Sequence, residues 1–322
     1  IKLRQMSTLF GKEDAKMQLT SIVCHDYLKE KELLGLKTSS LSTYSYTINS
    51  YILPYFPTYI EQINEGFLQD LIETYLLKAN RKSMTDIILL VNDILKYAFL
   101  KHYLKTSYRL PIPKGNKKKI EVFTMNEQEI LIHYLLEHFN NFNFGILLSL
   151  FTGIRIGELS ALLLNDLDEV LHINKTLQRV KCFDENSATK TVVIIDSPKS
   201  KTSIRDIPLQ SFLQDLISGL SRLDGTCYLL TGTRKYIEPR TVERRFKKIL
   251  EECHIPPRKF HILRHTFATN AVKRGFEIKT LSEILGHSSV KITLDLYVHI
   301  DMETKSHFMN MLTPSLKLSQ SI

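Results

Sequence analysis

Cysteine is scarce in this chain: its 322 residues include only four. The four are Cys24, Cys182, Cys227 and Cys253. None belongs to a CxxC pair or to a cysteine–histidine cluster with the spacing of a zinc site. This pattern argues against a disulfide-built scaffold and against a zinc module. Reduced thiols in a cytoplasmic protein are the simplest expectation.

Long apolar segments are also missing. The longest one, residues 144–151, is well short of the ~20 residues that a membrane-spanning helix needs. The sequence shows no signal-peptide pattern, internal repeat or low-complexity tract. We therefore expect a cytoplasmic location and no membrane partner. The first residue, Ile1, is not an initiator, so a further segment could precede it in the complete protein.

Acidic residues are outnumbered by basic ones. The chain has 34 Asp and Glu against 43 Lys and Arg, a net charge of +9 and a pI near 9.2. Such a surplus suits a polyanionic partner, for example nucleic acid. Hydrophobic residues make up 43% of the chain, enough for well-packed cores, and the length favours about two domains.

Helical periodicity runs through the first third of the chain. Apolar positions recur at helical spacing in segments that begin near Leu19 and near Leu41, and again over residues 67–77 and 84–104. We expect an all-helical domain over residues 12–110. Residues 111–122, rich in Pro, Gly and Lys and without periodicity, are then predicted to be an extended basic linker.

A second domain is predicted for residues 123–322, including a C-terminal tail. It opens with a capping box formed by Thr124 and Glu127. β-Branched runs predict strands over residues 169–180, 191–195 and 204–209, the last two joined as a hairpin, and the rest is predicted to be helical. The predicted fold class is mainly α with a small antiparallel β-sheet: an all-helical domain followed by an α+β domain.

Side chains that bind phosphate gather near the end of the sequence, in FHILRHTFATN and LSEILGHSSVKITLDLY. His261 and Arg264 are three residues apart, so they share one face of a helix and can reach the same ligand. The helix that follows, residues 278–285, should end at Gly286 in the left-handed conformation. His287 would then lie in a loop that can face the site.

One more helix should follow, capped by Ser288 or Ser289. The residues of its predicted buried stripe are Val290, Leu294 and Val298. Thr293 and Tyr297 are left together on a neighbouring face. A single tyrosine is more often a core residue than a nucleophile, but a tyrosine in this order after HxxR and GH is harder to explain by packing.

An arginine far upstream lies in an apolar setting, LLSLFTGIRIGELSALLLNDL. Gly153 and Gly157 flank Arg155, which places its guanidinium at the edge of a buried helix. Glu158 is three residues on and can hold Arg155 as an ion pair. An ordinary helix-surface pair, contributing about 0.3–0.5 kcal/mol, is the alternative. We favour a functional arginine oriented by Glu158.

Two lysines occupy the turn SPKSKTS between the last two predicted strands, Lys199 and Lys201. Alone they would be typical of a solvated basic turn. The residues discussed so far have a fixed order: Arg155, Lys199, His261, Arg264, His287 and Tyr297. This order resembles the tyrosine recombinases of the phage integrase family, above all the integrases of conjugative transposons.

The resemblance starts at Thr124, and every position of the family's pattern of Arg, Lys, His-x-x-Arg, His or Trp, and Tyr is filled. The first third of the chain is similar to the family's core-binding domain only loosely. In the family the lysine usually follows a Pro or Gly at the turn, which selects Lys199 while Lys201 competes. Related integrases carry an arm-binding domain before the core-binding domain.

These residue types suit the transfer of a phosphodiester to tyrosine. Arg155 and Arg264 can each donate two hydrogen bonds to the non-bridging oxygens. A tyrosine with an ordinary pKa near ~10 is a poor nucleophile at neutral pH, so a base must assist it, and His261 is the natural candidate. Lys199 can protonate the departing 5′ oxygen, and His287 can bind the phosphate or position the tyrosine. Neither a metal nor a cofactor is required.

The resemblance implies a recombinase that integrates or excises a mobile element. Its partners would be double-stranded attachment-site DNA, further copies of the chain in a homotetramer and accessory DNA-bending proteins. A type IB topoisomerase uses the same residues, but the long linker insertion before the tyrosine is missing here. A DNA-binding protein that has lost catalysis is disfavoured by the complete residue set. The apolar tail after Tyr297 would pack on a neighbouring subunit or, with similar support, on its own domain.

Cationic residues in three places are candidate DNA contacts: the linker, the turn and strand after Lys199, and a helix that begins at Pro239. That helix has a core stripe of Val242, Phe246, Ile249 and Leu250. A solvated surface is the competing account for each of these cations. The candidates are Lys117, Lys118, Lys119, Lys201, Arg205, Arg240, Arg244 and Lys247.

Overall fold

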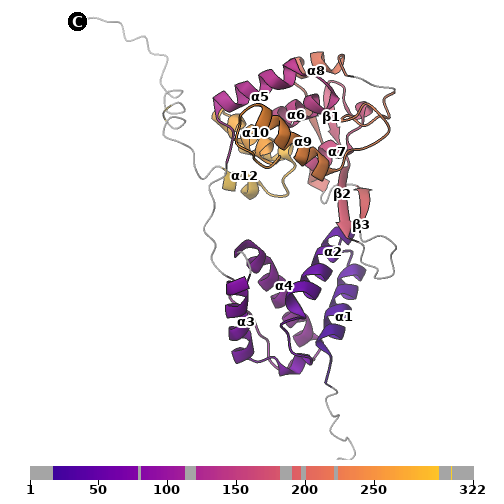
Figure 1. Ribbon diagram of the computed structural model, residues 1–322. Coiled ribbons are helices and arrows are strands. Elements are labelled where there is room, and N and C mark those ends of the chain that lie inside the picture. Colours follow the sequence, from indigo (N-terminus) through magenta and orange to yellow (C-terminus); the bar gives the residue numbers. More distant parts are fainter. Residues whose placement is uncertain are drawn as a thin grey trace, which may run out of the picture. The chain divides into compact units, whose positions relative to one another are not determined.

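The computed structural model describes residues 17–78, 81–112, 121–181, 191–196, 201–220 and 224–296, and residue 306. These residues form two compact units, one built from helices α1–α4 and the other around helices α5–α12 with strands β1 and β4 (Figure 1). Each unit has its own hydrophobic core. Within this part of the chain, no helix is both long and apolar enough to cross a membrane.

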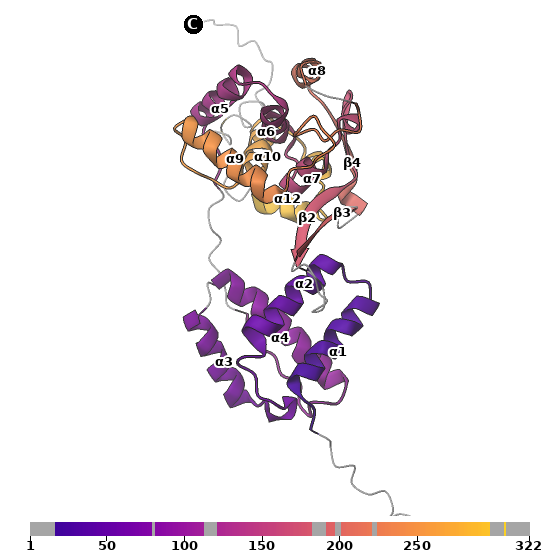
Figure 2. The same cartoon turned by 45° about the vertical axis from the view of Figure 1, so that its right-hand side comes forward.

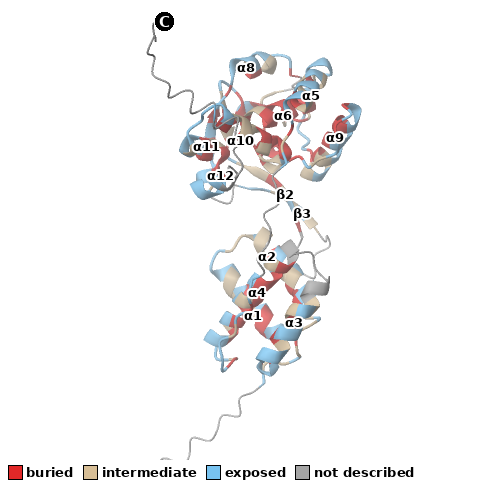
Figure 3. Ribbon diagram, turned by 90° about the vertical axis from the view of Figure 1, so that its left-hand side faces the viewer, coloured by how far each residue is buried: buried red, intermediate tan, exposed pale blue. Residues whose placement is uncertain are grey.

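Residues 17–112, which make up most of the described part of the first unit, are built from helices, as predicted. Its helices are α1 (Thr20–Leu33), α2 (Thr38–Thr47), α3 (Glu65–Lys78) and α4 (Arg81–Leu100). A π-helical turn, Ile48–Ile52, continues α2. Helices α1 and α4 pack against each other (Figure 2). Buried positions run along both (Figure 3), where Val23, Tyr27 and Ile88 are at most 1% exposed. The apolar periodicity of the sequence therefore marks the faces that form this core.

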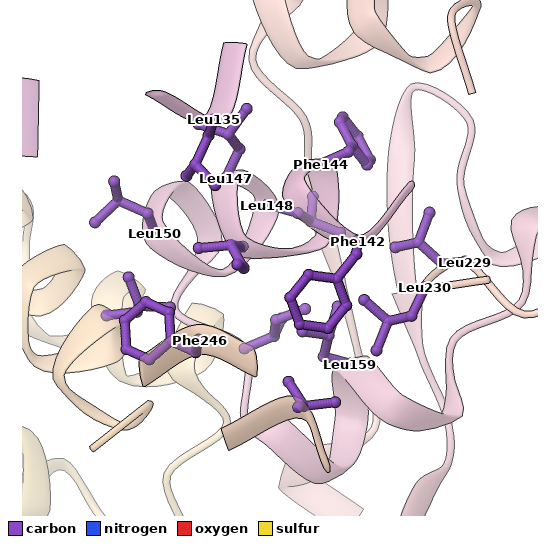
Figure 4. Packing of buried hydrophobic residues seen from close by; sticks show 14 of the residues in the cluster. Leu135, Phe142, Phe144, Leu147, Leu148, Leu150, Leu159, Leu229, Leu230 and Phe246 are labelled. Atoms are coloured by element: carbon purple, nitrogen blue, oxygen red, sulfur yellow. The ribbon is translucent and has the colours of Figure 1, made fainter. Parts of the chain in front are cut away.

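The second unit is arranged around a buried helix. Its helices are α5 (Met125–Glu137), α6 (Asn141–Thr152), α7 (Ile156–Ala161), α8 (Ser211–Ile217), α9 (Pro239–Glu252), α10 (Ile262–Lys273), α11 (Ile278–Leu285) and α12 (Val290–Leu296). Helix α6 is buried along most of its length, and α5 and α10 pack against it. Its Phe144, Leu147 and Leu148 are fully buried among leucines and phenylalanines of neighbouring elements (Figure 4).

Local signals in the sequence set several helix ends. The capping box at the start of α5 is confirmed: the Thr124 hydroxyl accepts a hydrogen bond from the Glu127 amide at 3.2 Å, and the Glu127 carboxylate accepts one from the Thr124 amide at 2.8 Å. Helix α9 begins at Pro239 and buries its predicted stripe. Helix α11 ends at Gly286, whose φ of 62° is in the left-handed region, as predicted.

The strands are present, but the predicted hairpin is wrong. The strands are β1 (Val170–Ile173), β2 (Thr176–Lys181), β3 (Thr191–Asp196) and β4 (Arg205–Pro208). β1 pairs with β4 in an antiparallel register that places Ile173 opposite Arg205, and β2 pairs with β3. The two strands expected to pair with each other instead pair with the two halves of the predicted strand 169–180. Hydrophobic alternation identifies a strand, but it does not identify the neighbouring strand.

The predicted buried face of α12 is also wrong. Val290 and Leu294 are 41% and 50% exposed, whereas Thr293 is fully buried. The Thr293 hydroxyl lies 2.8 Å from Nδ1 of His287, so a polar contact selects the face that this short helix buries. The capping prediction is confirmed, because the Ser289 hydroxyl accepts a hydrogen bond from the Lys291 amide at 3.2 Å.

Gly153 provides a test of the core of the second unit. It ends α6 at a φ of 69°, and a Cβ there would lie 2.6 Å from Phe267 and 2.8 Å from Leu285. We expect Gly153→Ala to lower the free energy of unfolding by more than the ~1–3 kcal/mol of left-handed strain alone, because crowding adds to it. Chemical denaturation measures the loss.

The matched control is Gly35→Ala. Gly35 also has a left-handed φ, of 82°, but a Cβ there meets nothing within 4 Å. This variant should therefore lose only the strain contribution. Equal losses for the two variants would show that crowding at Gly153 is unimportant.

Candidate active site

Arg155 is positioned by the turn between α6 and α7. Gly153 ends α6 in the left-handed conformation, and Arg155 is the N-cap residue of α7. The Glu158 carboxylate accepts hydrogen bonds from the Arg155 backbone amide at 2.9 Å and from its Nη1 at 2.8 Å. The predicted ion pair is therefore present. The Arg155 side chain remains 35% exposed and is accessible to a ligand.

Arg264 lies on α10 and is buried, with 3% of its surface exposed. Its Nη1 donates to the carbonyl of Gly153 at 2.8 Å, and its Nη2 donates to the carbonyl of Leu285 at 2.7 Å. His261 is the N-cap residue of the same helix and is exposed. One guanidinium thus joins the end of α6, the body of α10 and the end of α11.

Three successive carbonyls at the end of α11 accept hydrogen bonds from three different arginines. The pairs are Ile284 with Arg205 Nε at 2.5 Å, Leu285 with Arg264 Nη2 at 2.7 Å, and Gly286 with Arg155 Nη2 at 3.0 Å. The last carbonyls of a helix have no partner within it and carry its partial negative charge. Helix α11 therefore gathers three guanidinium groups, which with the single carboxylate of Glu158 give a net charge of +2.

The expectation that Arg205 contacts DNA is wrong. Its side chain is only 6% exposed and forms an ion pair with Glu158 at 3.0 Å. The sequence did contain a signal for this inward orientation, because Arg205 alternates in phase with Ile207 and Leu209, which are also buried.

Two histidines lie near the arginine cluster. Burial lowers the pKa of His287 to about 3, and the charges of Arg264 and Arg155 act in the same direction. Burial, with smaller effects of His265 and Arg264, lowers the pKa of His261 to about 4, although one side of this residue stays exposed. Both imidazoles are therefore neutral at pH 7 and can accept a hydrogen bond.

His287 borders open space. It lines a pocket of about 430 Å³ together with Thr202, Ser282 and Ser288, at the end of α11 where the arginines meet. Arg205 is a further lining residue of this pocket. The His261 ring packs edge-on against His265, with ring centroids 4.6 Å apart. The pocket thus joins His287 to one of the three arginines of the cluster.

Part of the predicted site falls outside the described residues. Those residues are Lys117, Lys118, Lys119, Lys199 and Tyr297. Lys201 begins the 3₁₀ helix Lys201–Ser203, but its side chain is likewise outside the description. The structure brings together Arg155, Glu158, His261, Arg264 and His287 from the predicted set.

The predicted basic face of α9 is exposed. Arg240, Arg244 and Lys247 all point away from the core stripe and are accessible to solvent. Their neighbour Arg245 instead packs over the ring of Phe142, at 5.3 Å from its centroid. The three cations are therefore available to a polyanion.

Comparison with known proteins adds to this geometry. Residues 121–304 match the phage integrase family, and residues 21–76 match the phage integrase N-terminal SAM-like domain. A tyrosine recombinase XerC-like protein of Caldanaerobacter subterraneus subsp. tengcongensis is 32% identical over 248 residues, which are 67% of this chain and 63% of that protein. The chain therefore spans less than two thirds of this relative's length.

Solved structures show the same fold. The Tn1549 transposon integrase in complex with a circular intermediate DNA has a TM-score of 0.70 at 19% identity, covering 92% of this chain and 100% of that one. A lambda integrase tetramer bound to a Holliday junction has a TM-score of 0.64 at 18% identity, covering 87% and 78%. At such identity the likeness concerns the fold alone, a helical domain followed by an α+β domain.

The family match covers more than half of the chain and contains the arginine cluster, His261 and His287. Fold, sequence match and site geometry agree, and this chain belongs to the phage integrase family.

Proposed function

We propose that the chain is a site-specific DNA recombinase that cleaves and rejoins strands through a 3′-phosphotyrosyl intermediate. The observation that carries the proposal is the arginine cluster at the end of α11, where the partly exposed Arg155 adjoins the buried Arg264. A net positive charge held by buried carbonyls and by Glu158 is suited to a phosphodiester. Membership of the phage integrase family supports the same reaction.

The arginines are arranged for two-pronged binding. Each terminal nitrogen of Arg155 and of Arg264 donates one hydrogen bond inside the protein. Because each such nitrogen carries two hydrogens, one on each nitrogen is left for a ligand. Two guanidinium groups can then hold both non-bridging oxygens of a phosphate, and their fixed positions reduce reorganisation as negative charge develops.

In the proposed reaction Tyr297 attacks the scissile phosphorus. A bond forms between the phenolic oxygen and phosphorus while the bond from phosphorus to the 5′ oxygen breaks. Neutral His261 accepts the phenolic proton, and Lys199 gives a proton to the departing oxygen. His287 hydrogen-bonds the phosphate or positions the tyrosine. Attack by a 5′-hydroxyl on the phosphotyrosine reverses these steps and rejoins a strand without a cofactor.

We further propose that the substrate is double-stranded attachment-site DNA of a mobile element, bound by a homotetramer with accessory DNA-bending proteins. The similar transposon and lambda integrases, described in complex with DNA and as a tetramer on a Holliday junction, support this. Residues 12–110 would be the core-binding domain, residues 111–122 the basic linker and residues 123–322 the catalytic domain. The α9 face would contact the DNA backbone.

The first test of the proposal is Tyr297→Phe. We expect DNA binding to be unchanged and the covalent adduct to disappear, because only the attacking oxygen is lost. A nicked suicide substrate carrying the attachment site would trap the wild-type adduct on a denaturing gel. An undiminished adduct in the Phe variant would refute the assignment of the nucleophile. Strand exchange between two sites, as opposed to relaxation of supercoils, separates a recombinase from a topoisomerase.

The second test separates the two lysines. Lys199→Ala should slow cleavage more than Lys201→Ala, since the general acid is assigned to Lys199. A substrate with a 5′-bridging phosphorothiolate needs no proton on its leaving group. It should restore cleavage to the Lys199 variant and leave Lys201→Ala unaffected. Rescue of the Lys201 variant alone would move the general acid by two residues.

The third test concerns the α9 face. Removing Arg244 and Lys247 together by substitution with Ala should weaken DNA binding and reduce the slope of log Kd against log salt concentration by about 0.9 for each lost phosphate contact. Fluorescence anisotropy over a salt series measures both effects. The control is Arg274→Ala, an exposed cation at the end of α10, which should leave the slope unchanged. An unchanged slope in the double variant would exclude α9 from the DNA contact.

A further inference from the structure

The guanidinium of Arg205 donates hydrogen bonds to three groups of the protein: the Ile284 carbonyl, the Glu158 carboxylate and the Ser203 carbonyl. Nε donates to the Ile284 carbonyl at 2.5 Å, and Nη2 donates to the Glu158 carboxylate at 3.0 Å. Nη1 donates to Glu158 at 3.2 Å and to the Ser203 carbonyl at 3.1 Å. Both partners of the ion pair are buried, with side chains 6% and 3% exposed. Arg205 therefore acts mainly on other protein groups.

The carboxylate of Glu158 is shared between two arginines. Oε1 accepts from Nη1 of Arg155 at 2.8 Å and from Nη1 of Arg205 at 3.2 Å. Oε2 accepts from the backbone amide of Arg155 at 2.9 Å and from Nη2 of Arg205 at 3.0 Å. The partly exposed Arg155 is thus oriented by a carboxylate that Arg205 also holds through both of its oxygens.

Arg205 also touches the second group that holds Arg155. Nη2 of Arg155 donates to the Gly286 carbonyl at 3.0 Å, while Arg205 binds the carbonyl two residues earlier, that of Ile284. The backbones are close here: a Cβ at Gly286 would lie 3.0 Å from Nη1 of Arg205 and 3.2 Å from Cα of Ser203. Both anchors of Arg155, the carboxylate and the end of α11, are therefore bound by Arg205.

Stability alone is a weak explanation for this arrangement. Transferring an ion pair from water into a protein interior costs free energy, and apolar residues of similar volume often stabilise a protein as well or better. An apolar residue in place of the arginine could not hold a carboxylate in one orientation with both carboxylate oxygens accepting hydrogen bonds. That property matters where a guanidinium must be placed accurately.

We propose that Arg205 is a positioning residue for DNA cleavage, which sets the placement of Arg155 through Glu158 and the end of α11. This role rests on the proposed recombinase function. It assigns Arg205 no contact with DNA, so substrate affinity and catalytic rate should respond differently to its removal.

The main experiment measures adduct formation on the nicked suicide substrate. Arg205→Met keeps the length of the side chain but removes the charge. We expect the rate of adduct formation to fall about 100-fold, the size of effect that a misplacement of ~1 Å causes, with Kd for the DNA unchanged. The matched control is Arg234→Met, which breaks an exposed pair with Asp224 and should leave the rate unchanged.

A second substrate distinguishes positioning from general damage. A methylphosphonate at the scissile position has one negative charge fewer, so its cleavage depends less on the arginines. The defect of Arg205→Met should therefore be markedly smaller on methylphosphonate than on phosphate, and Arg155→Met should show the same reduction. An equal defect of Arg205→Met on both substrates would overturn the proposal, as would a defect that lies mainly in DNA affinity.

Thermal melting accompanies both assays, because loss of a buried charge partner can unfold a protein. If Arg205→Met does not fold, Arg205→Lys replaces it: the ammonium keeps the charge beside Glu158 but cannot reproduce the planar fork. It should fold, cleave more slowly than wild type and recover on methylphosphonate. Wild-type cleavage by a folded Arg205 variant would refute the positioning role. A wild-type protein that forms no adduct would refute the recombinase function itself.

Discussion

The carbonyl groups at the C-terminal end of α11 are the interaction on which the rest of the site depends. A helix leaves its last carbonyls without internal partners, and three of them here accept hydrogen bonds from guanidinium groups that come from α10, from the start of α7 and from the start of β4. The left-handed Gly286 makes this possible by ending the helix abruptly, so the carbonyls stay accessible. Segments more than a hundred residues apart are thereby joined at one point, as the bond between Arg155 and Gly286 illustrates.

Concentrating like charges in this way requires a counterion, and Glu158 provides it. Burial alone would raise the pKa of this carboxyl, but hydrogen bonds and charge from Arg205, with a further contribution from Arg155, lower it overall. The carboxylate is therefore ionised and offsets one of the three positive charges. Burial lowers the pKa of His261 and of His287, and the remaining positive charge acts in the same direction, since protonating either imidazole would place another cation beside the arginines. The cluster that would bind a phosphate thus also keeps the neighbouring imidazoles neutral, as hydrogen-bond acceptors.

Much of this could be predicted from sequence because the signals are local. The capping box of Thr124 and Glu127, the start of α9 at Pro239, the end of α11 at Gly286 and the pair of Arg155 with Glu158 all involve residues at most a few positions apart. Two of the failures concern contacts between distant segments. Strand composition does not specify that β4 pairs with β1, and a single cation in a strand gives no indication that its partner is a glutamate 47 residues earlier. The alternation of Arg205 with buried residues of β4 indicated only that its side chain points inward.

The face of α12 shows why hydrophobic periodicity can fail beside a functional site. A helix of seven residues has little apolar area to bury, so one satisfied polar group can decide its orientation. Thr293 is buried because its hydroxyl meets the ring of His287, while Val290 and Leu294 face solvent. His287, a residue of the site itself, therefore determines which face of α12 packs on the second unit. Tyr297 follows α12 directly in the sequence. The hydrogen bond between His287 and Thr293 therefore couples the orientation of the helix that precedes Tyr297 to the position of His287.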